Sequence, residues 1–201
     1  MSILKFSPRS TVLLLIILVV AGLRLVTYFI SDPGPLALFT PIGAMALFGG
    51  AYFNGKIKPF TFPLLALFIS DLVLSFTVYS SLRSGLLYAG WYWTYGAFAL
   101  MTIAGKLLVK DVTIKHVVIG VITATLIHWL VSDIGGCLRE SNANAIFTVY
   151  LQRLVTAIPY ELRFLGGTAI YSAIMFGGFE WMQKKYPVLS EPGLSEPGLV
   201  G

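Results

Sequence analysis

The stretch TVLLLIILVVAGLRLVTYFI, from Thr11 to Ile30, holds 20 consecutive residues of which only one, Arg24, is charged. A helix needs roughly 20 predominantly apolar residues to cross the hydrocarbon core of a bilayer. Because hydrocarbon offers no hydrogen-bond partner to backbone amides, a spanning segment must satisfy its own backbone as an α-helix. The stretch therefore predicts a transmembrane helix, and it sets the solvent in which the rest of the chain is interpreted.

The remainder of the chain repeats this pattern. Of its 201 residues, 57% are hydrophobic and 11% are charged, which lies outside the range of soluble domains. The further apolar runs are Leu36 to Phe53, Phe60 to Tyr79, Leu86 to Ala104, His116 to Val131 and Gly166 to Trp181. They lack the strict alternation of a barrel strand. The predicted fold is therefore all-α, a polytopic membrane bundle of about six transmembrane helices.

The chain is predicted to form a single integral membrane domain over residues 1–187, because no polar linker divides the apolar runs. After Pro187 the sequence SEPGL occurs twice in tandem, at Ser190 to Leu194 and at Ser195 to Leu199. Such a segment has nothing to bury, so residues 188–201 are predicted to be a disordered C-terminal tail.

The lysines indicate the orientation, because basic residues beside short loops stay on the cytoplasmic side of a membrane. With six spans and a cytoplasmic N-terminus, that side receives every lysine: Lys5, Lys56, Lys58, Lys106, Lys110, Lys115, Lys184 and Lys185. We predict a multi-pass protein of the bacterial inner membrane with both termini in the cytoplasm. The pI near 9.4 arises from loop ends and not from one basic patch, so we expect no nucleic-acid partner.

The longest stretch between predicted spans, Ser132 to Leu165, is itself rich in apolar residues. Within it, Ala145 to Tyr160 is compatible with a helix, but Gln152 and Arg153 lie at its centre and Pro159 near its end. Polar and charged side chains are costly inside a membrane, which argues against an independent span. We predict an interfacial or re-entrant element on the outer face.

Ionisable residues within the predicted spans concentrate in the outer half. Arg24, Asp71 and His128 each lie past the midpoint of their runs, and Asp133 and Arg139 follow on the same side. Each such group calls for a partner or a purpose. We interpret them as ligand-binding residues in a polar chamber that opens outward. The alternative is that Arg24 and Asp71 form a buried ion pair that fixes helix register, with the loop charges merely solvated.

The aromatic run Trp91, Tyr92 and Trp93 begins the fourth predicted helix on the outer side. Amphipathic rings favour the headgroup region, which alone explains an aromatic belt. Successive helical residues point about 100° apart, however, so at least one of these rings should face the bundle interior. We include the three residues in the predicted ligand site, where an inward ring stacks on a flat ligand.

Cys137, the single cysteine, excludes an internal disulfide. Together with His128 it is a weak candidate for a soft metal-ligand pair, and a packed histidine with an incidental cysteine is the alternative. The sequence contains no HExxH motif, no phosphate-cradling glycine loop and no paired catalytic carboxylates. We therefore predict no catalytic residues, no cofactor and no enzymatic activity.

Small residues recur at four-residue spacing as Ala46 and Gly50, and again as Ala169, Ala173 and Gly177. Such stripes let helices approach closely. They serve either packing inside this bundle or docking of another membrane protein.

Four stretches carry a family resemblance: PIGAMALFGGAYF (Pro41 to Phe53), PLLALFISDLVL (Pro63 to Leu74), WYWTYGAFAL (Trp91 to Leu100) and AIPYELRFLGGTAIYSAIMFGGFE (Ala157 to Glu180). They resemble an uncharacterised family of small bacterial inner-membrane proteins that is similar to the substrate-capture (S) components of energy-coupling factor (ECF) transporters. The resemblance implies a six-helix protein that binds a vitamin-like micronutrient near its outer face. It also implies docking on a shared transmembrane subunit with paired ATPases.

One position departs from that pattern. Such components often display an AxxxA stripe on the first helix, whereas here Ala21 is followed four residues later by Leu25. Related proteins that work alone include cobalamin-specific ones that engage cobalt through a cysteine, but Cys137 lies elsewhere, so a corrinoid ligand is only a guess.

The expected function is a membrane substrate-binding component for uptake of a small water-soluble micronutrient, with that ligand and the lipid bilayer as partners. The alternative is a non-transporting membrane scaffold resembling proteins of rod-shape and envelope assembly.

Overall fold

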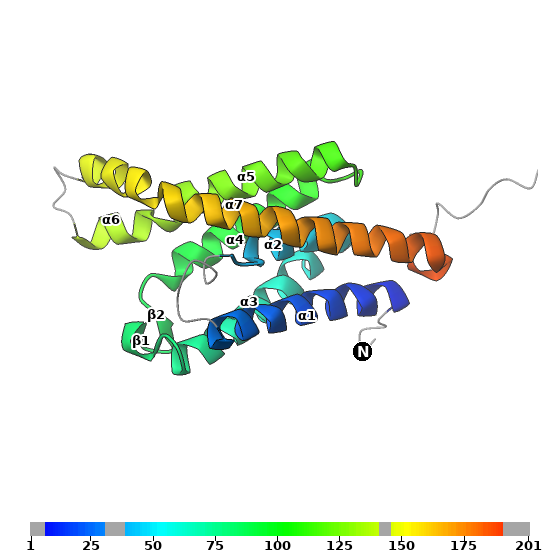
Figure 1. The fold of residues 1–201 in the computed structure, drawn as a ribbon, viewed down its shortest axis with the longest axis horizontal. Coiled ribbons are helices and arrows are strands. Elements are labelled where there is room, and N and C mark those ends of the chain that lie inside the picture. The colour runs from blue at the N-terminus through cyan, green and yellow to red at the C-terminus, as the bar shows by residue number, and fades with distance from the viewer. Residues whose placement is uncertain (1–6, 31–38, 141–145, 191–201) are drawn as a thin grey trace, which may run out of the picture.

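The computed structural model describes residues 7–30, 39–140 and 146–190, and at positions 27, 28, 30, 136, 139 and 140 it describes the backbone alone. The chain folds into an elongated helical bundle (Figure 1). In chain order the elements are α1 (Pro8–Ile30), α2 (Ile42–Tyr52), α3 (Lys58–Phe76), η1 (Ser80–Leu82), β1 (Arg83–Ser84), β2 (Leu87–Tyr88), α4 (Trp91–Leu108), α5 (Ile114–Ser132), α6 (Ile134–Glu140), α7 (Ile146–Lys185) and η3 (Pro187–Leu189).

The short helix α2 forms the centre of the bundle. Every residue from Ile42 to Gly50 is buried, and α2 packs against α3, α4, α5 and α7. A Cβ on Gly50 would come within 2.1 Å of the Thr102 carbonyl oxygen, so α4 approaches the α2 backbone directly. The stripe of Ala46 and Gly50 therefore serves packing inside this bundle.

Among the residues that the structure describes, four helices are long and apolar enough to cross a membrane, namely α1, α3, α5 and α7. The run Leu36 to Phe53 was predicted as a full span, but α2 has 11 residues, about 16 Å at ~1.5 Å per residue. It begins directly after Pro41, which has no backbone N–H and suits a helix start. Neighbouring helices and not lipid surround α2, so it does not need the length of a bilayer.

The structure corrects the prediction for the segment Ala145 to Tyr160, of which it describes residues 146–160. These residues are not a separate interfacial or re-entrant element, because α7 is one continuous helix of 40 residues that includes Pro159. At ~1.5 Å per residue it is about 60 Å long, twice the ~30 Å of a hydrocarbon core. Gln152 and Arg153 therefore lie in length that a span does not need, so their polarity does not prevent the helix.

The packed domain also extends beyond its predicted boundary at Pro187. Leu189, in η3, is 4% exposed, and its carbonyl oxygen accepts a hydrogen bond of 2.7 Å from Arg9 Nη1. The predicted tail was placed at 188–201, but its first residues, 188 and 189, lie in η3, and Leu189 is buried. Residues 191–201, with most of the SEPGL repeat, lie outside the described residues.

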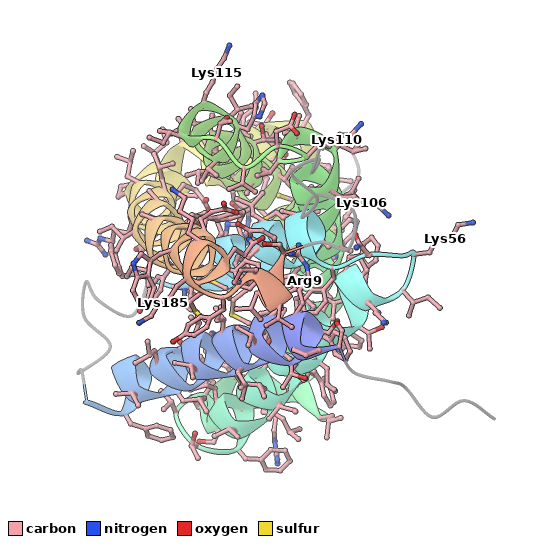
Figure 2. All side chains as sticks on the ribbon, turned by 90° about the vertical axis from the view of Figure 1, so that its right-hand side faces the viewer. Arg9, Lys56, Lys106, Lys110, Lys115 and Lys185 are labelled. Carbon is pink, nitrogen blue, oxygen red and sulfur yellow. The ribbon has the colours of Figure 1, made fainter. Side chains whose placement is uncertain are left out.

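The two ends of the bundle differ in character. At one end lie the β1–β2 hairpin, α6 and the first turns of α7, and we call this the hairpin end (Figure 1). The other end, which faces the viewer in Figure 2, carries Lys56, Lys106, Lys110, Lys115 and Lys185, and we call it the basic end. The predicted gathering of lysines on one side is confirmed in space for these five residues.

Candidate functional site

Arg24 and Asp71 form an ion pair within the bundle. Arg24 Nη2 of α1 lies 2.6 Å from Asp71 Oδ1 of α3, and the two side chains are 7% and 2% exposed. Arg24 Nη1 donates to the hydroxyl of Ser70, and the Tyr95 hydroxyl of α4 donates to Asp71 Oδ2 at 3.2 Å. Three helices thus converge on one pair whose charges compensate each other.

A cavity of about 500 Å³ opens beside this pair at the hairpin end. Its lining consists of one cation, one anion and otherwise uncharged side chains: Arg24, Asp71, Tyr79, Leu82, Tyr88 and Ala89. Three of these lining residues come from the hairpin region: Leu82 lies in η1, Tyr88 lies in β2, and Ala89 follows β2 directly. The hairpin therefore forms a wall of the cavity, and we call this space the hairpin cavity.

The hairpin turns at Gly85, whose φ of +85° is a backbone conformation that favours glycine. Its second strand, Leu87–Tyr88, falls within the run Leu86 to Ala104 that was predicted as a span, but α4 starts only after Gly90, which also has positive φ. This places Tyr88 against the cavity. Burial and, second, the negative charge of Asp71 raise the pKa of Tyr88 to about 12, so its hydroxyl remains a hydrogen-bond donor at neutral pH.

A second polar cluster lies between α5 and α7. His128 Nδ1 is 2.9 Å from Glu161 Oε1 and 3.1 Å from Oε2, and the imidazole stacks on Phe164 with centroids 4.0 Å apart. Asp133 follows at the end of α5. Its pKa is raised, first by burial and then by the negative charge of Glu161, against opposing effects of Arg153 and His128.

The single predicted chamber is therefore two separate clusters. Arg24 and Asp71 line the hairpin cavity, whereas His128 and Asp133 lie with Glu161 between two other helices. The rotation of each helix about its axis determines this division, because a side chain contacts only the helix towards which its own face is turned. The alternative reading of Arg24 and Asp71 as an ion pair is confirmed for their contact.

The predicted aromatic residues lie outside the lining of the hairpin cavity. Trp91 and Tyr92 are 41% and 56% exposed, as lipid or headgroup contacts would be. Trp93 is the half-buried ring, and it covers Gly135 of α6, where an added Cβ would come within 2.2 Å of its indole. The expectation of an inward ring is thus confirmed for Trp93, but it packs against α6. The side chain of Arg139 lies outside the described residues.

Within the described part of the chain, no group of three His, Cys, Asp or Glu side chains is arranged to hold a metal. Cys137 is buried and lines a cavity of about 460 Å³ with Ile134 and Tyr150. His128 Nδ1 is engaged by Glu161. Among these described side chains, Cys137 and His128 do not belong to a group that could hold a metal.

Several site residues escaped the sequence prediction. Tyr79 ends the predicted run Phe60 to Tyr79, and Tyr88 lies near the start of the run Leu86 to Ala104. Aromatic residues at the ends of predicted spans carry no specific signal, because such rings favour the headgroup region anyway. Glu161 was missed as a site residue because it lies in the segment assigned outside the membrane. An ionisable residue inside a continuous apolar helix would have been recognised as functional.

A further polar cluster lies at the basic end. The Tyr52 hydroxyl donates to Glu180 Oε1 at 2.6 Å, and Gln183 Nε2 donates to the same oxygen at 3.2 Å. Arg9 Nη1 donates to Gln183 Oε1 at 3.2 Å, and these residues line a cavity of about 530 Å³ together with Lys110. Both ends of the bundle thus carry a polar cavity.

A family model described as a family of unknown function (DUF6580) matches residues 4–189. No curated protein and no solved structure matches the chain. Because the match spans almost the whole sequence, from before α1 to the end of η3, the chain belongs to the DUF6580 family.

Proposed function

We propose that this protein is a membrane solute-binding protein that captures a small water-soluble molecule in the hairpin cavity, as a component of nutrient uptake. The observation that carries the proposal is the cavity of about 500 Å³ with the buried pair Arg24 and Asp71 in its lining. Ligand sites in proteins are typically clefts of ~300–1,000 Å³ with a few placed polar groups, and this cavity has that form.

The charges indicate what kind of solute fits. Arg24 and Asp71 neutralise each other, and the other lining residues are uncharged. A solute with net charge would have to compete with this pair in a poorly solvated site. An uncharged or zwitterionic solute can instead hydrogen-bond to the phenol of Tyr88 and pack on Tyr79 and Leu82.

The ring of lysines at the basic end supports an orientation for capture. Positive residues are retained in the cytoplasm, so the basic end is proposed to be cytoplasmic and the hairpin cavity to face outward. In this arrangement α2 and α4 join the four longer helices in a six-span protein of the bacterial inner membrane.

The resemblance to ECF S components also supports capture on the outer face. It does not supply a docking stripe on α1, because Ala21 is buried in the core of the bundle. The proposal therefore concerns binding of the solute, with docking on an ECF transmembrane subunit and its ATPases as a separate question.

Mass spectrometry of the purified protein for a co-purifying small molecule tests the proposal. We expect the wild type and Trp91→Leu to retain the molecule, because Trp91 lies outside the cavity lining. The double variant Arg24→Met with Asp71→Leu should lose it while remaining folded. A ligand-free preparation that no panel of uncharged or zwitterionic vitamins stabilises against heat would contradict the proposal.

The second candidate is a membrane scaffold, and one observation favours it. The small residues Ala169, Ala173 and Gly177 of α7 are exposed and line a groove between α5 and α7, unlike the buried stripe of α2. Close helix contact at this stripe would suit a permanent partner. Cross-linking in native membranes distinguishes the two, because a stable complex with envelope-synthesis proteins that Ala173→Leu disrupts would favour the scaffold.

A further inference from the structure

The surface of the bundle is hollowed between α5 and α7, in the half that ends at the basic end. This groove has a volume of about 500 Å³ and is lined by Val117 and Val121 of α5 and by Leu165, Ala173 and Gly177 of α7. Ala173 and Gly177 are exposed, and nothing lies within 4 Å of a Cβ placed on Gly177. The small residues of α7 therefore leave open space between the two helices. We call this space the α5–α7 groove.

The α5–α7 groove is about as long as one leaflet of a bilayer core is thick. Its lining extends from Thr113, the N-cap of α5, to Ile122, which is about 14 Å at ~1.5 Å per residue. One half of a hydrocarbon core measures ~15 Å. Apart from Thr113 and Glu180 at the basic end and the fully buried Ser172, the lining is apolar. This length and this lining suit one acyl chain of a lipid.

At the basic end the groove adjoins the polar cavity that Arg9 and Lys110 line. The two spaces share three lining residues, Val112, Thr113 and Glu180. The polar cavity has a volume of about 530 Å³. The groove and the cavity thus form one two-part site that is apolar along the helices and polar at the basic end. A ligand that fits both parts must be amphiphilic.

The polar cavity offers charges of both signs in equal number. Its charged lining residues are Arg9, Lys110, Asp111 and Glu180, and Figure 2 shows Arg9 and Lys110 at this end of the bundle. Arg9 and Glu180 each form a hydrogen bond with a neighbouring side chain of the cavity. Lys110 and Asp111 are exposed, so their side chains can turn towards the head of a ligand.

We propose that the groove and the cavity together bind one phospholipid whose head carries a phosphate and a primary ammonium group. One acyl chain lies in the α5–α7 groove, and the other remains in the surrounding bilayer. The phosphate pairs with Lys110, since cations form charge-assisted hydrogen bonds with phosphate oxygens. The ammonium group donates to the carboxylates of Asp111 and Glu180. In the orientation proposed above, this head lies at the cytoplasmic surface.

The balance of charge favours such a zwitterionic head over an anionic one. Two cations and two anions line the cavity, so a head with one charge of each sign meets a partner for both. An anionic head would pair with Lys110 but would also approach Asp111 and Glu180, and like charges brought together cost free energy. A transmembrane helix of a partner protein could cover the groove, but it would leave the charges of the adjoining cavity without a ligand. The two-part site therefore favours a lipid.

Native mass spectrometry of the full chain in detergent micelles tests the recognition of the head. The protein is titrated with phosphatidylethanolamine, phosphatidylcholine or phosphatidylglycerol, all with the same acyl chains. Phosphatidylethanolamine should bind as one molecule per chain, about threefold to fivefold more tightly than the other two lipids. Phosphatidylcholine has no ammonium N–H to donate, and phosphatidylglycerol has no ammonium group. Lys110→Gln combined with Asp111→Asn keeps the net charge and should remove this preference.

Variants of α7 test the groove. Ala173→Phe fills it with a ring and should weaken binding of phosphatidylethanolamine at least about tenfold, the size of effect expected from overpacking. Gly177→Leu should do the same, and its side chain enters open space. Ile174→Phe is the matched control, because Ile174 is 60% exposed and lies outside the groove lining, so it should leave binding unchanged. Circular dichroism and gel filtration establish folding, and Gly177→Leu decides if Ala173→Phe does not fold.

Wild-type protein that retains no phosphatidylethanolamine would overturn the proposal, as would equal or tighter binding of either other lipid. Equal losses in Ile174→Phe and in the folded groove variants would do the same. So would a partner protein that cross-links at Ala173 in native membranes and excludes the lipid.

The lipid site is independent of the proposed solute site, because Arg24 and Asp71 line a different cavity at the hairpin end. Arg24→Met with Asp71→Leu should therefore retain the lipid, and Ala173→Phe should retain the solute. Failure of one proposal is thus distinguishable from failure of the other.

Discussion

At the scale of single residues, the molecule is distinguished by charges that its apolar environment would not favour. Arg24 and Asp71 are almost fully buried, yet both Nη atoms of Arg24 and both Oδ atoms of Asp71 meet a partner of opposite charge or a hydroxyl group. Burial of an ion pair costs desolvation free energy that the contact only partly returns. Such a pair is expected where it fixes register or serves a ligand, and the adjoining cavity allows both roles here.

Removal of one member of the pair should be far more harmful than removal of both. Asp71→Leu leaves the Arg24 guanidinium buried without its carboxylate, which should lower the free energy of unfolding by ~3–5 kcal/mol. Arg24→Met with Asp71→Leu replaces both charges by apolar groups and should recover most of that loss. Chemical unfolding in detergent micelles measures both variants. Equal destabilisation by the single and the double changes would contradict this explanation, because the loss would then not come from an unpaired Arg24 guanidinium.

Asp133 should make stability depend on pH in a definite direction. Its pKa in the folded protein is raised above the ordinary 3.8, so the fold favours the protonated form. The ionised form then weakens the folded state, and stability falls as the pH rises from the unfolded pKa through the folded pKa. Asp133→Asn removes this effect.

Thermal unfolding over a pH series measures the change. Asp133→Asn should be more stable than the wild type at pH 7, and the difference should disappear at a pH below the ordinary pKa of 3.8. A difference that persists unchanged at low pH would show that the asparagine acts by another route.

At the scale of the elements, the surroundings of the glycines differ between the central helix α2 and the helix α7. Gly50 of α2 has no space for a Cβ, which would come within 2.1 Å of the Thr102 carbonyl oxygen. Gly177 of α7 has nothing within 4 Å of the same position. The two glycines occur in similar small-residue stripes, so the sequence alone does not distinguish them.

Alanine at these two positions should therefore have opposite effects. Gly50→Ala should cost ~1–3 kcal/mol, because the backbones of α2 and α4 must separate. Gly177→Ala should stabilise by up to ~1 kcal/mol, because alanine is the better helix former where nothing clashes. Unfolding of each variant in micelles measures the difference. A neutral Gly50→Ala would mean that α4 does not approach α2 as closely as described.

The element that sequence reasoning assigned least well is α7. Gln152, Arg153 and Pro159 were interpreted as interruptions, because each is unfavourable inside a bilayer span. The helix instead continues through them for 40 residues. Local polarity indicates only that a residue avoids lipid. The contacts of α7 with α5 and α6 allow these residues to avoid lipid and still remain part of a helix.

At the scale of the whole molecule, the basic end and the hairpin end give the bundle a direction. Five lysines surround one end in Figure 2, and the hairpin cavity opens at the other. Because lysines beside short loops are retained in the cytoplasm, the cavity is proposed to face outward.

Reporter fusions test that orientation. A reporter fused after Lys185 should indicate a cytoplasmic location, whereas one inserted at Gly85 of the hairpin should indicate a periplasmic location. Labelling of single introduced cysteines with a membrane-impermeant reagent provides a control that adds no domain. A periplasmic signal after Lys185 would overturn both the orientation and the six-span arrangement.

The sequence by itself predicted the membrane environment, the helical character and the placement of the lysines on one side of the bundle. It could do so because hydropathy and lysine positions are local properties of the chain. It also identified Arg24, Asp71 and His128 as ionisable residues within apolar runs, where each requires a partner or a function. Tertiary structure alone decided that Arg24 meets Asp71 while His128 meets Glu161, and that α2 is enclosed by other helices. Those pairings depend on the rotation and depth of each helix, which packing against neighbours fixes and no local pattern encodes.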